Sequence, residues 1–185
     1  MTQIHLLLLP ILLSSVLVFI VSSIIHMFSP WHKGDFPGLP DQDRILDALR
    51  PFDLKRGEYL LPRAASMEEM KSEAHKEKVK KGPVVILNVF PQGGSSMAKS
   101  LVLWFIYLLV VGSFGAYVAG RALPIGAHYL SVFRYVGTVT FLTYAGGLWQ
   151  NSIWYNKPWS TTIKSTVDGL IFGLLTAGVF GWLWP

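Results

Sequence analysis

The sequence predicts an all-α membrane protein with four transmembrane helices and a small α+β extramembrane insert between the first and second helices. Hydrophobic residues make up 51% of the 185 residues and charged residues only 15%, against roughly a quarter charged in soluble domains. The apolar residues are gathered into four long stretches. In the second and fourth stretches small residues recur at every fourth position, a pattern typical of membrane helices that pack closely together.

Residues 1–27 are predicted to contain the first transmembrane helix, which runs from about residue 4 to residue 27. No basic residue precedes this stretch, and its apolar length exceeds the roughly 7 to 15 residues of a signal-peptide core. We therefore expect a retained helix whose N-terminus lies outside the cell.

Residues 28–99 are predicted to form a cytoplasmic α+β insert. This segment holds 12 basic and 10 acidic residues, and such a balance argues against a nucleic-acid partner. An insert of this size has a thin core unless it rests on the membrane or on a partner. The expected elements are a helix at 41–50, a strand at 57–61, a helix at 66–81 that begins with a Ser66/Glu69 capping box, and a strand at 84–90.

Residues 100–185 are predicted to form a series of three transmembrane helices, at about 100–123, 129–150 and 162–184. The connections are short, so consecutive helices should be antiparallel neighbours. Lysines near the membrane ends gather on one side, which should be cytoplasmic, and both termini then lie outside. The residues that set this orientation are Lys33, Lys80, Lys81, Lys99, Lys157 and Lys164 on one side and Arg121 on the other.

The small residues form two stripes, each on one face of a helix because four residues make about one turn. Such stripes let another backbone approach closely, either within the chain or from a second subunit, and the sequence leaves both readings open. The first stripe is Gly112, Ala116 and Gly120, and the second is Gly169, Gly173, Ala177 and Gly181.

Arg134 and Asp168 are the ionisable residues predicted inside the spans, where charge is costly and marks functional paths. Each lies about 8 Å deep, from opposite membrane faces, so their depths differ by more than roughly 10 Å. We therefore expect no direct salt bridge between them. Asp168 has Lys164 one turn earlier and His26 at a comparable depth.

The sequence names no catalytic residue and predicts no cofactor. The absence of cysteine excludes thiolate metal sites and iron–sulfur clusters, so a metal or haem would use histidine or carboxylates. Haem remains an alternative, with His5, His26 and His128 as candidate ligands and His5 with His128 as one conceivable axial pair. His32 and Asp35, close in sequence, are a further candidate for a small polar site.

Two segments resemble known sequences. They are Pro30-Trp31-His32-Lys33 and the last segment of the sequence, from Asp168-Gly169-Leu170 to Trp182-Leu183-Trp184-Pro185. Through them the chain resembles a group of uncharacterised bacterial multi-span inner-membrane proteins. The resemblance implies a location in the bacterial inner membrane and attaches no activity.

We therefore expect a non-catalytic accessory or assembly subunit of a larger inner-membrane complex, such as an energy-converting complex, with the small-residue stripes as docking surfaces. Its partners would be membrane lipids and other membrane-protein subunits, without nucleic acid. The alternative is a small transporter or channel component that uses Arg134 and Asp168. A third reading is a redox subunit whose cofactor is held by His5, His26 or His128.

Overall fold

A computed structural model describes all 185 residues and divides the chain into two compact units. A helical unit comprises Met1–Pro37 and Met97–Pro185, and an insert comprises Gly38–Ser96. Residues 28–37, which the sequence assigns to the insert, thus belong with the helices. This difference matters because the segment carries His32 and Asp35.

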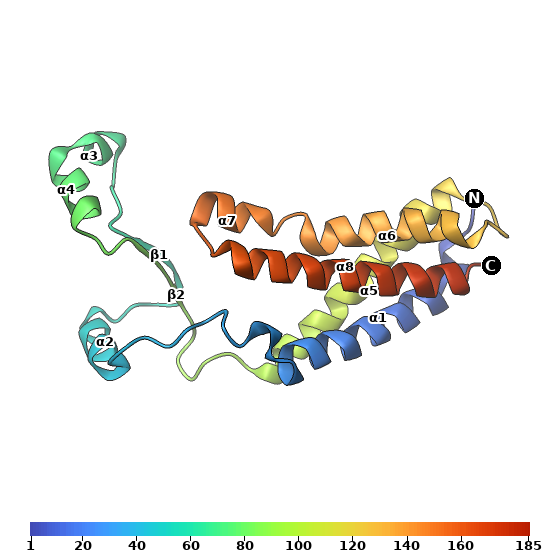
Figure 1. Cartoon of the computed structure of the whole chain (residues 1–185), viewed down its shortest axis with the longest axis horizontal. Helices are drawn as coiled ribbons and strands as arrows, with labels where there is room; N and C mark the ends of the chain where they lie inside the picture. Colours follow the sequence, from blue (N-terminus) through green and yellow to red (C-terminus); the bar gives the residue numbers. More distant parts are fainter. The chain divides into compact units, whose positions relative to one another are not determined.

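The helical unit contains four long helices, and short turns join those that follow the insert (Figure 1). A 3-10 turn precedes α1 and a wider π-helical turn follows it, and the three segments together form the first span. The elements are η1 (Ile4–Leu7), α1 (Leu8–Ser23), η2 (Ile24–Phe28), η3 (Pro30–His32), α5 (Met97–Ala122), α6 (Tyr129–Ala145), α7 (Trp149–Tyr155) and α8 (Trp159–Trp182).

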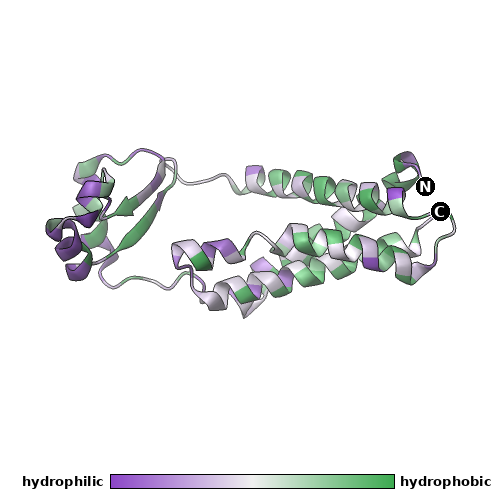
Figure 2. Cartoon of the chain, turned by 90° about the horizontal axis from the view of Figure 1, so that it is seen from above, coloured by the Kyte–Doolittle hydropathy of each residue, from purple (hydrophilic) through white to green (hydrophobic).

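Three helical segments are long and apolar enough to cross a membrane: Ile4–Phe28, Met97–Ala122 and Trp159–Trp182. Figure 2 shows the apolar residues distributed along these helices. The predicted span at 129–150 is instead divided into α6, of 17 residues, and the separate helix α7. Gly146 and Gly147 lie in the turn between them, where glycine disfavours a continuous helix. The fourth span therefore stays a prediction.

The four main helices contact one another in a closed ring: α1 packs against α5 and α8, and α6 packs against α5 and α8. Both termini lie at one end of this unit, where the Thr2 amide donates to the Gly120 carbonyl over 2.7 Å and the Gly126 amide donates to the Pro185 carbonyl over 2.6 Å. Two apolar clusters fill the interior, one around Phe180 and one around Phe172.

Both small-residue stripes pack against helices of the same chain. On α5, a Cβ at Gly112 would lie 3.4 Å from the Ile11 side chain. On α8, a Cβ at Gly173 would lie 3.1 Å from the backbone nitrogen of Phe141 on α6. The stripes thus let α5 approach α1 and let α8 approach α6, as close backbone packing in membranes requires.

Within the insert, two antiparallel strands, β1 (Gly57–Leu61) and β2 (Val85–Val89), pair Tyr59 with Leu87 at their centre. Three short helices accompany them: α2 (Gln42–Leu49), α3 (Met67–Lys71) and α4 (Glu73–Lys81). The single helix expected at 66–81 is divided, because Ser72 has an extended backbone and its hydroxyl caps α4 at the His75 amide. Ser66 caps α3 at the Glu69 amide, as the capping box predicts.

Candidate functional site

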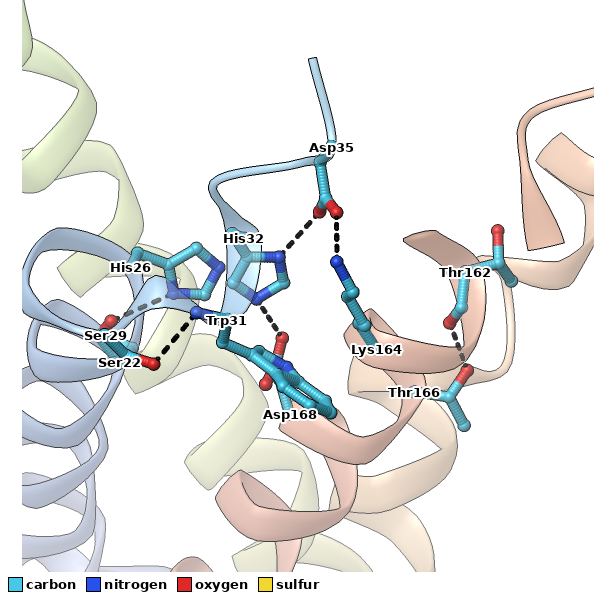
Figure 3. Close-up of polar contacts among 10 residues, drawn as sticks. All are labelled: Ser22, His26, Ser29, Trp31, His32, Asp35, Thr162, Lys164, Thr166 and Asp168. Atoms are coloured by element: carbon cyan, nitrogen blue, oxygen red, sulfur yellow. Dashed lines mark hydrogen bonds and ion pairs between the residues drawn. The ribbon is translucent and has the colours of Figure 1, made fainter. Parts of the chain in front are cut away.

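Five polar side chains meet where the end of the first span and the first half of α8 come together (Figure 3). We call this group the His–Asp cluster. The short η3 turn carries His32 and contacts α8. The turn begins with a hydrogen bond from the Trp31 amide to the Ser29 hydroxyl. The cluster comprises His26, His32, Asp35, Lys164 and Asp168.

His32 bridges two carboxylates. Its Nδ1 atom lies 2.7 Å from Oδ2 of Asp35, and its Nε2 atom lies 2.8 Å from Oδ2 of Asp168. The Asp35 and Asp168 side chains are only 7% and 5% exposed, and His32 is 15% exposed. This bridge joins residues 136 positions apart and ties the first span to α8.

The bridge formed by His32 requires one proton more than a neutral imidazole carries. A neutral histidine carries one N–H and cannot donate to both carboxylates, so either the ring is an imidazolium or one carboxyl is protonated. Lys164 completes the group: its Nζ donates to Oδ1 of Asp35 over 2.8 Å. With His32 protonated, positive and negative groups alternate along the cluster, and such pairing offsets part of the desolvation of buried charge.

His26 lies beside this bridge on the π-helical turn η2. Its Nδ1 atom is 2.9 Å from the Ser22 carbonyl, so Nδ1 carries the hydrogen and Nε2 keeps a free lone pair. The ring stacks on His32 with centroids 4.5 Å apart and planes 9° apart. One ligand atom from each of His26, His32 and Asp168 can be chosen so that all lie within 4.8 Å of one another.

Asp168 retains an unsatisfied acceptor. Its Oδ1 atom is buried and has no hydrogen-bond partner, although Oδ2 accepts from His32. A cavity of about 320 Å³ lies beside it, lined by Asp168 and His26 together with Trp104, Tyr107, Tyr144 and Phe172 among others. The cavity beside the cluster is therefore lined by both polar and aromatic side chains.

The pKa of the Asp35 carboxyl is held below its usual value, because it accepts hydrogen bonds from His32 and from Lys164. A lowered pKa stabilises the folded state at pH values above the ordinary aspartate value of about 3.9, and this contribution is lost as the pH falls below it. We therefore expect thermal stability in nonionic detergent, followed by tryptophan fluorescence, to fall between about pH 5 and pH 3. An Asp35→Asn variant should lose less over this interval, whereas Asp53→Asn, in an exposed pair with Lys55, should follow the wild type.

The two ionisable residues predicted inside the spans, Arg134 and Asp168, lie in different surroundings. Asp168 is buried in the His–Asp cluster, whereas Arg134 is exposed on the surface of α6 and makes no ion pair. The structure does not bring the two together. Lys164 pairs with Asp35 rather than with Asp168 one turn away, so its partner lies across the helix interface.

The remaining candidate histidines lie away from the cluster. His5 is exposed on η1, and His128 caps the N-terminus of α6, where its Nδ1 atom accepts from the Leu130 amide over 3.2 Å. His26, the third haem candidate, stacks on His32. Sequence reasoning noted the closeness of His32 and Asp35 and the similar depth of His26 and Asp168. It missed that His32 joins them.

The fold and the cluster define a helical protein with membrane-length helices and a buried polar site at one helix interface. Comparisons with protein-family models, with curated proteins and with solved structures gave no match.

Proposed function

We propose that the chain is a four-pass protein of the bacterial inner membrane, with a cytoplasmic insert and both termini outside. The 17 residues of α6 extend about 25 Å, close to the roughly 30 Å of a bilayer core, and the helix is flanked in the ring by two helices of full length. Lys33 follows the first span, Lys157 precedes α8 and Lys164 lies near the start of α8, all on the side assigned to the cytoplasm, which supports this orientation.

Within that membrane the proposed role is a non-catalytic accessory or assembly subunit of a larger complex. One observation carries this proposal: the insert has no apolar core of its own. His75 is its only buried residue, while twelve large hydrophobic side chains are exposed. These are Leu39, Ile45, Leu46, Phe52, Leu60, Leu61, Met67, Met70, Val79, Val84, Ile86 and Phe90. A unit of this size needs a covering surface, because small domains bury a limited fraction of their area.

A protein surface fits this need better than a lipid surface. Residues 38–96 carry 10 basic and 9 acidic side chains, so anionic lipid would gain little net attraction. The exposed hydrophobic residues are interspersed with both signs of charge, a composition that suits a protein partner with an apolar centre and a polar rim. The two glycine stripes, which pack inside the chain, are not part of this docking proposal.

Helix α2 offers a direct test. Ile45, Leu46 and Leu49 lie along one side of this helix, and Leu46 is 49% exposed. Replacing Leu46 with glutamate should place a charge in the docking surface and weaken partner binding by tenfold or more, the scale of about 1.4 kcal/mol. Native membranes would be extracted with gentle detergent, and the size of the chain's complex would be measured by native electrophoresis.

Arg44→Glu is the matched control, since it introduces the same residue on the opposite side of α2. We expect the wild type and Arg44→Glu to migrate with the same identified protein partner, and Leu46→Glu to migrate alone. A wild-type chain that migrates as a lone monomer, or a Leu46→Glu chain that keeps its partner, would contradict the accessory role. The transporter alternative has less support, because the cavity lined by Asp168 is not lined by Arg134, which is exposed on α6.

A further inference from the structure

We propose that His26, His32 and Asp168 bind a divalent transition-metal ion of the zinc class. This proposal goes beyond the accessory role and does not depend on it. The three residues come from the end of the first span and from α8, so an ion would join the two segments. Their ligand atoms lie within 4.8 Å of one another, and rotation of the His26 ring out of its near-parallel stack on His32 would let both imidazoles coordinate one ion.

Both histidines already make the second-nitrogen hydrogen bond that metal-binding histidines usually make. A metal-binding imidazole donates its second ring N–H to a carbonyl or a carboxylate, which fixes the tautomer and leaves the other nitrogen free. His26 uses Nδ1 on the Ser22 carbonyl, and His32 uses Nδ1 on the Asp35 carboxylate. Lys164 in turn holds Asp35 through its other oxygen.

The π-helical turn η2 contributes to this arrangement. Its defining bond runs from the Ser29 amide to the Ile24 carbonyl over 3.1 Å, five residues apart. Such wide turns in otherwise regular helices are frequent at functional sites. Here the turn carries His26, whose ring stacks on that of His32.

Asp168 supplies an independent observation. The residue is 3% exposed, and its Oδ1 atom is buried without any partner. An unpaired buried acceptor is costly, and carboxylate oxygens rarely remain in this state. A metal ion that contacts both oxygens of this carboxylate would satisfy Oδ1, which the bridge from His32 to Oδ2 leaves without a partner.

Binding requires a small opening of the existing bridge. Nε2 of His32 and Oδ2 of Asp168 lie 2.8 Å apart as a hydrogen-bonded pair. Two donor atoms on one tetrahedral zinc ion, each about 2.0 to 2.1 Å from it, are separated by roughly 3.3 Å. The ion therefore takes the place of the bridging proton, which leaves to solvent, and the two side chains move apart by about half an ångström.

The donor set selects the class of ion. Two imidazoles and one carboxylate suit zinc and its first-row neighbours, whereas calcium and magnesium prefer oxygen ligands alone. Three protein ligands leave a fourth position open. The cavity of about 320 Å³ lined by His26 and Asp168 offers space for a water molecule or another ligand there.

The test uses the full chain in detergent, purified without a histidine tag and treated with a chelator. Zinc chloride is added, loosely held ion is removed by desalting, and retained zinc is measured by mass spectrometry together with isothermal titration calorimetry. We expect one zinc ion per chain. His26→Ala should weaken the affinity by roughly 100-fold or more, since even loss of a residue that orients a ligand costs 10- to 100-fold.

His26→Ala is the informative variant because it removes no residue of the Asp168–His32–Asp35 bridge, and we therefore expect it to fold. His5→Ala, which removes an exposed histidine far from the cluster, is the control and should bind as the wild type does. Asp35→Asn should weaken binding about tenfold through His32. The proposal is overturned if the wild type retains no zinc, if His26→Ala binds as tightly as the wild type, or if His5→Ala causes the same loss.

Discussion

Replacing Gly173 with leucine is expected to destabilise the helical unit by about 3 kcal/mol, at the upper end of the usual cost of overpacking. Gly173 lies where α8 meets α6, and a Cβ there would already be 3.1 Å from the Phe141 nitrogen and 3.2 Å from its Cα. These neighbours are backbone atoms, which cannot rotate away, so the two helices must separate. The measurement is unfolding in mixed micelles with increasing sodium dodecyl sulfate, followed by the fluorescence of the seven tryptophans.

Gly178→Leu is the matched control on the same helix. The nearest atom to a Cβ at Gly178 is the Tyr129 hydroxyl at 3.8 Å, so a side chain has more room there. We expect this variant to lose less than about 1 kcal/mol, in the range of substitutions that cause little strain. Equal destabilisation by the two substitutions would show that close α6–α8 packing does not depend on Gly173.

The long helices were predictable because their signals are local. An apolar stretch of more than 20 residues and a small residue at every fourth position are readable without knowing any neighbour. The capped start of α3 at Ser66 is local for the same reason. The predictions were less accurate where two local signals compete, as at Ser72, which caps a new helix inside a charged segment, and at Gly146, where apolar composition continues but the helix ends.

The His–Asp cluster was not predictable because it depends on how distant segments are oriented. The sequence indicates the depth of His26 and Asp168, but not that η3 turns His32 back over α8. Lys164 illustrates the difference: spacing within the helix favours Asp168 as its partner, yet tertiary structure supplies Asp35 at 2.8 Å. One clue was available. Asp168 is the only acidic residue outside residues 28–99, and a lone intramembrane carboxylate calls for a specific partner.

Replacing Asp168 with asparagine is expected to destabilise the chelator-treated protein by about 2 kcal/mol, the scale of a hydrogen bond to a charged group. Asparagine keeps the shape and one acceptor but removes the charge that faces His32. Average hydrogen bonds between membrane helices contribute only about 0.6 kcal/mol. A larger effect is expected here because the bridge is charged and both carboxylates are buried.

A double-mutant cycle separates the bridge from other effects of the substitutions. Asp168→Asn and His32→Gln, alone and together, should reveal a coupling free energy of at least about 1.5 kcal/mol. The same cycle on the exposed pair of Asp47 and Arg50, whose side chains are 66% and 68% exposed, should give less than about 1 kcal/mol. If the coupling of Asp168 with His32 is no greater than that of the exposed pair, the bridge does not hold the first span on α8. The first span would then be held on α8 by the Lys164–Asp35 pair and by apolar packing in the clusters around Phe180 and Phe172.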